Sequence, residues 1–245
     1  MPDHHVPAPG RHTVFQTSIM SALLDGVYDG EMTIGELLEH GDFGLGTFNA
    51  LDGELLILDG QAHQLRDGRA EPADPALMTP FAVVTHFVPR MTVELPRDIE
   101  RADVGAAVAD LVGSDNYLAA MRITGDFHWV RTRTAGRQSK PYPPLREATD
   151  GEPVHAWDDI SGTLGGFRTP LYEQGIGVPG RHVHFIDDSR SRGGHILDYR
   201  VRRATLEVCL ATDLHLALPL TEAFRGADLH PADLAEQIEA TENHT

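Results

Sequence analysis

The chain contains 245 residues, and its 20 lysines and arginines against 37 aspartates and glutamates give a formal net charge of −17. So acidic a chain is not expected to follow nucleic-acid phosphates or to bind an anionic membrane. Its one cysteine, Cys209, cannot form an intramolecular disulfide, a cysteine-rich zinc cluster or an iron–sulfur site. The 14 histidines are the unusual part of the composition, because a neutral imidazole is the commonest metal ligand.

The sequence contains no recognisable targeting or membrane-spanning segment. Residues 1–14 lack the basic start and the unbroken apolar run of a signal peptide. No apolar run approaches the roughly 20 residues that a membrane helix needs. We therefore expect a cytoplasmic protein whose residues 1–13, rich in proline and histidine, form a flexible N-terminal tail.

The part of the chain that follows this tail predicts two helices and then an antiparallel meander. Apolar residues recur at helical spacing within 17–28, and Thr33 with Glu36 forms a capping-box pattern that opens a short helix over 34–40. Asp-Gly pairs then separate short apolar runs, which is the strongest short-range signal for hairpins. The strands expected in this region span residues 44–48, 54–58, 62–65 and 80–87.

A longer helix and a second group of strands are predicted further along the chain. Apolar spacing over 97–112 predicts a helix that ends at Gly113. Two strands, 117–123 and 127–133, are expected to form a hairpin around a Gly-Asp pair. Three prolines within 138–144 exclude a central strand and predict a connection there. Further strands are expected over 161–168, 182–186, 195–201, 204–210 and 213–218, with a closing helix after Pro231.

Three histidines form the strongest candidate site in the sequence. His182 and His184 lie two residues apart on a predicted strand, and the period-2 alternation puts both imidazoles on one face with Cα atoms about 6.5 Å apart. His195 starts the next predicted strand, so a hairpin would return it beside the other two. The preceding Gly193 and Gly194 would let the backbone bend there without a side-chain clash. Three histidines without a fourth protein ligand are the composition of a catalytic zinc site with open positions.

Other interpretations of this histidine pattern stay open at the level of spacing. Two histidines two apart on a strand are often a solvent-facing pair without a metal. A cupin carries the same pair followed by Glu and then Gly; here Asp188 and Gly194 match loosely, without the Glu, and would indicate a metal-dependent oxygenase or isomerase. A non-catalytic metal-binding module, with Cys209 as a candidate to complete its ligand set, is the third alternative. The other histidines are isolated or lie in the tails.

The order of these elements predicts an α+β fold. We expect strand-rich, mixed or antiparallel β-sheets with few peripheral helices, arranged as two β-sheet lobes with the metal site between or beside them. The expected division is an N-terminal α/β sheet domain over 14–145 and a C-terminal metal-binding β domain with a closing helix and tail over 146–245. A chain of this length allows one large domain or two small ones.

Several segments closely resemble the α-acetolactate decarboxylase family. They occur in the family's order and with similar spacing from about residue 14 to the C-terminus, so that together they are far more specific than any one alone. Among them are an Arg-Thr-Arg-Thr stretch at 131–134 and the histidine segments themselves. The full set comprises residues 15–28, 40–49, 51–54, 79–82, 131–134, 166–170, 182–186 and 193–199.

The resemblance implies a zinc-dependent decarboxylation of (2S)-2-acetolactate (2-hydroxy-2-methyl-3-oxobutanoate) to (R)-acetoin and CO2, a step of acetoin and butanediol biosynthesis. It implies that Zn2+ is held by His182, His184 and His195, that the partner is this small-molecule substrate, and that the chain forms a homodimer. One departure is Arg181, where many members have Tyr before the first ligand. That exchange would alter the pocket rim or a contact to a ligand and leave the ligands themselves intact.

By the same resemblance, the family's active-site residues other than the ligands fall on Thr47, Glu54, Arg133 and Glu242, with Glu239 close enough to compete for the last assignment. A guanidinium matches a carboxylate bidentately, so Arg133 is expected to hold the leaving carboxylate. Glu54 is expected to protonate the metal-stabilised enediolate, and Thr47 to orient a carboxylate or the substrate hydroxyl. Glu242 is expected to relay a proton, to bind an open metal position or to close the pocket.

Two further expectations concern the surroundings of the metal. Asp187 and Asp198 are candidates to fix the imidazole tautomers from outside the ligand set. No organic cofactor is expected, because Gly44 and Gly46 lack the third glycine and the following helix of a dinucleotide-binding fingerprint.

Overall fold

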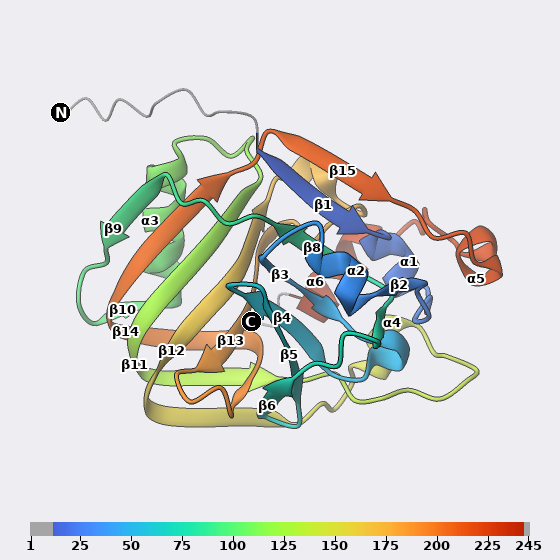
Figure 1. The fold of residues 1–245 in the computed structure, drawn as a ribbon, viewed down its shortest axis with the longest axis horizontal. Helices are drawn as coiled ribbons and strands as arrows, with labels where there is room; N and C mark the ends of the chain where they lie inside the picture. Colours follow the sequence, from blue (N-terminus) through green and yellow to red (C-terminus); the bar gives the residue numbers. More distant parts are fainter. Residues whose placement is uncertain (1–11, 243–245) are drawn as a thin grey trace.

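A computed structural model of the chain describes residues 12–242 and is built around two large β-sheets (Figure 1). The first sheet has seven strands in the order β15-β1-β8-β3-β4-β5-β6, and all its neighbours are antiparallel except β1 and β15. Its strands are β1 (Thr13–Thr17), β3 (Phe43–Thr47), β4 (Glu54–Leu58), β5 (Gln61–Arg66), β6 (Arg69–Pro72), β8 (Ala82–Thr85) and β15 (Asp213–Ala217).

The second sheet is antiparallel and contains the longest strands. Its order is β10-β14-β11-β12-β13, with β9 also paired to β14. At one end β13 pairs with β14 as well, so the four long strands close into a ring there. The strands are β9 (Met91–Glu94), β10 (Ile99–Glu100), β11 (Ala119–Arg133), β12 (Val154–Thr169), β13 (Gly180–Asp187) and β14 (Gly193–Leu210).

The helices are short and lie at the outside of the sheets or at their ends (Figure 1). They are α1 (Met20–Leu24), α2 (Ile34–Leu38), α3 (Arg101–Val112), α4 (Leu145–Ala148), α5 (Glu222–Gly226) and α6 (Leu234–Glu242), with single 3-10 turns η1 (Asn49–Leu51) and η2 (Leu171–Glu173). A small ribbon of β2 (Met32–Thr33) and β7 (Met78–Thr79) completes the fold. The predicted strand-rich α+β class is therefore confirmed.

The main hydrophobic core lies between the two sheets. Buried side chains of β3 and β4, such as Phe43 and Leu56, pack in one cluster with Phe167 of β12 and Ile186 of β13. The sheets approach closely at Gly165, where a Cβ atom would lie 3.0 Å from the side chain of Leu58. Each fully buried apolar side chain of this kind contributes about 1.5–3 kcal/mol to folding. This core fixes β4 against β13, which is the contact that builds the site.

Several local predictions are confirmed by the structure. Thr33 caps α2, and Glu36 returns the capping-box hydrogen bond as its spacing predicts. The helix α3 ends at Gly113, which adopts a left-handed conformation with φ of 69°. The Asp-Gly pairs lie in the turns of the β3-β4-β5-β6 meander, and β4 has the predicted limits.

The predicted hairpin within 117–133 is wrong, because β11 runs through Gly125 without a turn. It pairs along its length with both β12 and β14. A Cβ atom on Gly125 would lie 2.2 Å from the carbonyl oxygen of Arg203, so this glycine permits close strand packing. The pairing of β11 with β14 changes register near Phe127, as at a β-bulge, and continues beyond it. For the same reason the strands expected over 195–201 and 204–210 form one strand, β14.

The first predicted helix is shorter than expected. Residues 13–17 form β1, which lies between β8 and β15, and only Met20–Leu24 is helical. The pairing with β15 joins residues about 200 positions apart and ends at Thr17, while the helix reaches its C-cap at Asp25, just before Gly26 with its φ of 87°. The predicted tail therefore ends before Thr13, and its residues 1–11 lie outside the described part of the chain.

The boundary between the sheets does not fall at residue 145. β11, from the first predicted domain, pairs with β12 and β14 of the second. Conversely β15, near the C-terminus, adds to the sheet that contains β1. The division into domains over 14–145 and 146–245 thus crosses both sheets, since the chain passes from one sheet to the other more than once.

Candidate metal centre

The three predicted histidines lie together where the ring of long strands closes. β13 and β14 form the expected hairpin, and its register places His184 directly opposite His195. His182 follows on the same face of β13, since alternate residues of a strand share a face. The three ring centroids are 5.0–5.4 Å apart. Behind the hairpin, a Cβ atom on Gly194 would lie 2.7 Å from the carbonyl oxygen of Arg133, so glycine lets β11 approach at this point.

A main-chain contact from the other sheet sets the tautomer of His184. Its Nδ1 lies 2.8 Å from the carbonyl oxygen of Leu55 on β4 and therefore donates its proton there. The lone pair of Nε2 is then directed toward Nε2 of His182, 3.2 Å away. This contact performs the tautomer-fixing role that Asp187 and Asp198 were expected to play.

Burial keeps these imidazoles neutral. Desolvation, with a smaller contribution from the positive charge of Arg133, lowers the pKa of His182 to about 3. The pKa of the fully buried His184 is lowered well below its ordinary value by desolvation and by the neighbouring His182, although the Leu55 carbonyl acts in the opposite direction. Neutral imidazoles are the form that binds a metal ion.

The donor set fits a divalent metal ion. The ligand nitrogens of the three histidines all lie within 4.8 Å of one another. Two nitrogens bound about 2.05 Å from a tetrahedral zinc ion would be about 3.3 Å apart, close to the separation of the His182 and His184 Nε2 atoms. Two lone pairs held this close, with protons excluded by burial, are satisfied by a shared cation.

Glu54 reaches the cluster from the neighbouring sheet. One carboxylate oxygen lies 3.7 Å from Nε2 of His184, and the other accepts a hydrogen bond of 3.1 Å from the backbone N–H of Ala135. Thr47 stands opposite Glu54 in the β3–β4 pair, and its hydroxyl donates to the Gly53 carbonyl at 2.7 Å. Thr47 therefore holds the turn that precedes Glu54 rather than the carboxylate itself.

Arg133 lies beside the cluster, opposite His195 in the β11–β14 pair. Its Nη1 donates to the Glu152 carboxylate at 3.0 Å, and both side chains are almost fully buried, with 8% and 6% exposed. Its Nη2 donates to the backbone carbonyl of Thr241 near the end of α6. Among the described residues, the buried Nε has no hydrogen-bond acceptor.

Two cavities meet at Arg133 and Glu152. The inner cavity, about 40 Å3, has apolar walls from α1, η1 and Phe81 and a polar end at His182, His195 and Glu54. The outer cavity, about 790 Å3, extends past the loop that contains α4 and is also lined by Arg146. Because both share Arg133 and Glu152, this ion pair stands between the metal cluster and the outer cavity.

The two C-terminal glutamates differ in their position on α6. Glu239 is exposed to solvent, whereas Ile238 and Thr241 are buried. Glu242 is the last residue of the helix, four positions after Ile238, and its side chain lies outside the described atoms. The helical register therefore separates Glu239 from the inner face of α6.

Other sequence candidates lie elsewhere. Asp187 is used within the hairpin turn, where it accepts hydrogen bonds from the backbone N–H groups of Ser191 and Arg192. Asp198 accepts from the N–H group of Tyr199. These contacts give both carboxylates a local structural role, so their expected role on the imidazoles is wrong.

The residues that the cupin and the non-catalytic metal-binding interpretations require do not lie beside the three histidines. Asp188 is exposed in the turn, which removes the loose cupin match. Cys209 is buried at the far end of β14, beside Ala120, and the group of potential ligands found among residues 12–242 contains only the three histidines. Arg181 donates to the Arg101 carbonyl on α3 and does not line the inner cavity.

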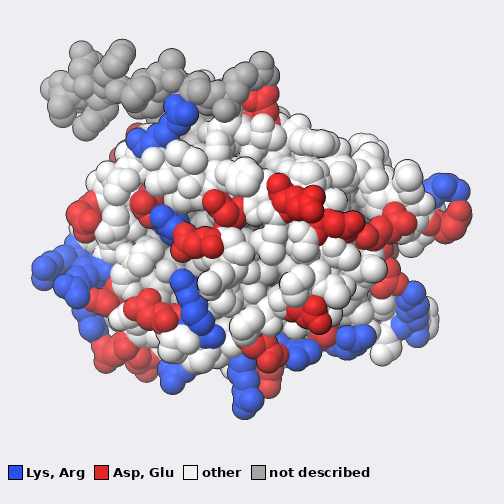
Figure 2. All heavy atoms as spheres, viewed as in Figure 1, with Lys and Arg blue, Asp and Glu red and all other residues white. Residues whose placement is uncertain are grey.

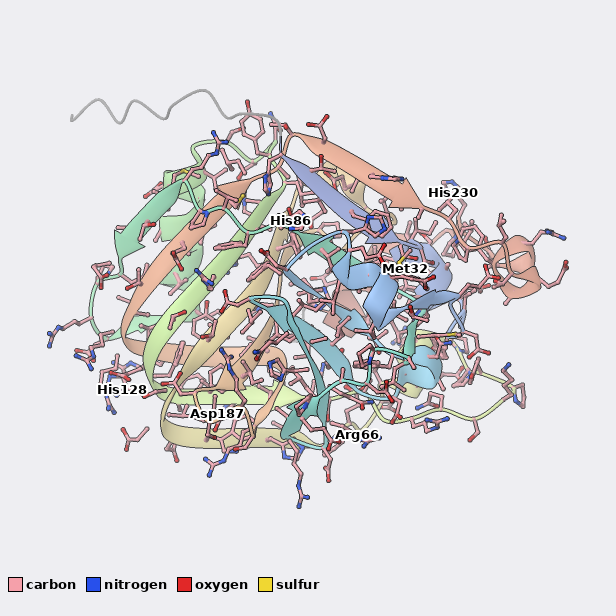
Figure 3. The ribbon with its side chains drawn as sticks, in the orientation of Figure 1. Met32, Arg66, His86, His128, Asp187 and His230 are labelled. Carbon is pink, nitrogen blue, oxygen red and sulfur yellow. The ribbon has the colours of Figure 1, made fainter. Side chains whose placement is uncertain are left out.

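The other described histidines do not join the three-histidine group, although His40 and His215 lie near each other with ring centroids 6.5 Å apart. Figure 3 shows His86, His128 and His230 at distant points of the molecule. His128 lies 2.5 Å from Asp98 in a surface ion pair, while His86 and His230 are exposed. Most of the 14 histidines therefore have no part in the candidate site.

Sequence reasoning missed three contributors to this centre: the Leu55 carbonyl, the Ala135 N–H and the Glu152 side chain. The first two are backbone groups, which any residue type would supply. Glu152 lies in a Gly-Glu-Pro turn with no periodic pattern around it. Its only available signal was the need of a buried Arg133 for a counter-charge.

Removal of the metal should make the stability of the folded protein fall as the pH drops below about 6.5. The buried His182 and His184 stay neutral in the folded chain, whereas both take up protons at their ordinary pKa after unfolding. Because the unfolded state then binds more protons, the free energy of unfolding decreases with falling pH, by up to about 1.4 kcal/mol per pH unit for each histidine. Urea unfolding of the chelated protein between about pH 7.5 and 5.5 measures the slope.

Two variants separate this effect from other titrations. His184→Gln removes one of the buried imidazoles and should make the pH slope shallower than that of the chelated parent. His86→Gln, at an exposed position, should leave the slope unchanged. Equal slopes for the parent and His184→Gln would contradict the prediction.

Comparison with known proteins identifies the family. Its sequence model, described as Alpha-acetolactate decarboxylase, matches residues 14–231. An alpha-acetolactate decarboxylase of Methylococcus capsulatus is 47% identical over 219 residues, which cover 89% of this chain and 84% of that protein. One of Klebsiella aerogenes is 45% identical over 231 residues, or 94% of this chain and 89% of that protein. The crystal structure of alpha-acetolactate decarboxylase from Bacillus subtilis strain 168 matches with a TM-score of 0.93 at 42% identity, covering 95% of this chain and all of that one. This chain therefore belongs to the α-acetolactate decarboxylase family of enzymes.

Proposed function

We propose that this protein decarboxylates (2S)-2-acetolactate to (R)-acetoin and CO2, using a zinc ion held by His182, His184 and His195. The observation that carries the proposal is the convergence of three histidines beside a cavity that Glu54 and Arg133 also line. In the reaction the carboxylate leaves as CO2, its bonding electrons remain on the substrate as an enediolate, and one proton joins the carbon that lost the carboxylate. The site must therefore hold a carboxylate, accept an electron pair and deliver a proton.

Zinc is the proposed metal because three histidines with an open position are typical of catalytic zinc sites. Three imidazoles also suit other divalent ions, so the identity of the metal is part of what is tested. When bound, the ion supplies a Lewis acid that draws electron density toward the substrate's ketone oxygen. The contact of His184 with Leu55 supports this assignment, since a fixed tautomer presents the lone pair to the ion.

Arg133 is proposed to bind the substrate's carboxylate. A guanidinium is matched in shape and charge to a carboxylate, and Nε of Arg133 is a buried donor without an acceptor among residues 12–242. Its place opposite His195 brings the anion-binding group next to the metal ligands. Arg133 thereby directs the carboxylate side of the substrate away from the metal cluster.

Glu54 is proposed as the proton donor. The Ala135 N–H holds one carboxylate oxygen while the other lies near His184, so the carboxyl group has a fixed place at the polar end of the cavity. Protonation of one face of the enediolate from a fixed group would set the chirality of acetoin. Thr47 supports Glu54 by fixing the preceding turn through Gly53.

Purified protein supplied with racemic 2-acetolactate under anaerobic conditions tests the proposed function. We expect CO2 and (R)-acetoin in equal amounts, together with about one metal ion per chain by elemental analysis. Turnover that begins only when air is admitted, or a dependence on Fe(II), would instead support an oxygenase. Absence of CO2 release from metal-loaded protein would refute the decarboxylase activity.

Glu242→Gln should lower kcat by about tenfold to a hundredfold, while Glu239→Gln should not change it. Glu242 is proposed as the C-terminal active-site glutamate because α6 brings its end to Arg133 through the Thr241 carbonyl. Glu239 carries the same charge on the exposed face of the same helix. Acetoin formation at saturating substrate gives kcat for both variants. Equal rates for the parent and Glu242→Gln would show that Glu242 takes no part in the reaction.

Three expectations stay predictions: zinc as the metal, a homodimer and a cytoplasmic location. Within residues 12–242 no helix is both long and apolar enough to cross a membrane. Elemental analysis and light scattering would test the first two directly.

A further inference from the structure

We infer that Glu152 is a specificity-determining residue that occupies the guanidinium of Arg133 before the substrate arrives and competes with the substrate's carboxylate for it. This inference rests on the proposed function only in taking Arg133 as the anion-binding group. It assigns a role to a residue of the wall between the inner and outer cavities.

The ion pair between Arg133 and Glu152 is almost completely buried. Arg133 and Glu152 have side chains that are 8% and 6% exposed, and their Nη1 and carboxylate oxygen are 3.0 Å apart. A buried guanidinium without a counter-charge is strongly unfavourable, so the resting protein needs the Glu152 carboxylate where it is. Glu152 thus stabilises Arg133 in the position that a substrate anion would later use.

The substrate's carboxylate would be a second negative group beside Arg133, in addition to Glu152. Nη1 of Arg133 donates one hydrogen bond to Glu152 and Nη2 donates one to the Thr241 carbonyl, while Nε is the nitrogen that has no acceptor among the described residues. A bound substrate carboxylate would place two negative groups on one guanidinium at a site with little water. Like charges in such a place disfavour each other by a factor of about ten to a thousand in equilibrium terms.

The outer cavity provides the space for a displaced carboxylate. Glu152 lines it as well as the inner cavity, and Arg146 lines the same outer space. A rotation of Glu152 toward that side would keep its charge in water, in a space that Arg146, Glu147 and Asp150 also line, and would free the N–H of Nη1 that Glu152 now accepts. On the face shown in Figure 2, acidic and basic side chains are interspersed.

This competition predicts an unusual effect of removing a charge from the site. Glu152→Gln keeps an acceptor oxygen for Nη1 but has no charge, so it should bind an anionic ligand more tightly than the parent does. A residue that only positions Arg133 would have the opposite effect, since its loss would weaken anion binding. The two roles therefore differ in the sign of the change.

The experiment measures the Kd of 2-hydroxyisobutyrate, an α-hydroxy acid that lacks the ketone and cannot react, on the metal-loaded enzyme. Its neutral amide, 2-hydroxyisobutyramide, is the reference ligand. We expect Glu152→Gln to lower the Kd of the acid by about tenfold or more and to leave that of the amide nearly unchanged. Glu147→Gln, which removes the same charge at an exposed position near the outer cavity, should change neither by as much as twofold.

An unchanged or raised Kd of the acid in Glu152→Gln would overturn the inference. If this variant does not fold, Glu152→Ala removes the same charge, and the ratio of the amide Kd to the acid Kd must still rise. The parent enzyme's CO2 release from 2-acetolactate is measured alongside. Failure of that release refutes the proposed function, whereas release with no gain in acid binding refutes only the role of Glu152.

Discussion

Replacing His184 with alanine should remove the metal ion and lower kcat by at least about a hundredfold. His184 is fully buried between its two companions, with Nδ1 committed to the Leu55 carbonyl and Nε2 3.2 Å from Nε2 of His182. Loss of this central imidazole leaves two ligands that are too few for a stable catalytic zinc site. Elemental analysis of the purified variant and acetoin formation at saturating substrate measure the two effects.

A matched histidine provides the control for this loss. His230→Ala removes an exposed imidazole that is not part of the three-histidine group and should retain metal and activity. Thermal unfolding of both variants with excess chelator separates metal loss from global unfolding. If His184→Ala retained one metal ion per chain and the parental rate, the three-histidine centre would not be the catalytic site.

Glu54→Gln should retain the metal ion and lower kcat by about a hundredfold to ten-thousandfold. Glutamine keeps a carbonyl oxygen that can accept from Ala135 N–H, so the side chain should stay in place without an acidic proton to donate. The rate of CO2 release and the chirality of acetoin should both be measured. Slow, non-stereoselective protonation by water is the expected outcome when the fixed donor is absent.

Glu71→Gln is the matched control for Glu54→Gln. Glu71 lies on β6 of the same sheet, exposed and paired with Arg66, so its neutralisation should not affect turnover. A parental rate with unchanged chirality in Glu54→Gln would show that another group donates the proton. Loss of metal in that variant would instead assign Glu54 to the support of the ligand set.

The parts of the site that could be predicted from sequence are those in which neighbouring residues already define the geometry. Strand alternation places His182 and His184 on one face, and a short turn brings His195 back to them. The same locality explains the success of the Thr33 cap and of the turns in the meander. In each case a few consecutive residues contain the whole interaction.

The missed parts depend on contacts between segments far apart in the chain. His184 meets the carbonyl of Leu55, 129 positions away, and Arg133 meets the carbonyl of Thr241, 108 positions away. A backbone carbonyl gives no signal in the sequence, and Asp187 and Asp198 were plausible only because carboxylates are visible there. Likewise a glycine at position 125 indicates a turn locally, while packing against Ala204 makes it part of a continuous strand.

The parallel pairing of β1 with β15 also determines the order in which the molecule can be completed during synthesis. β1 is synthesised about 200 residues before β15, its partner in the sheet. The hairpin that carries the histidines and the helix that contacts Arg133 are also synthesised long after β1. Until β15 has been made, β1 lacks this neighbour, and contacts of such long range form slowly. The three histidines can act together on a metal ion only once His195 has been added.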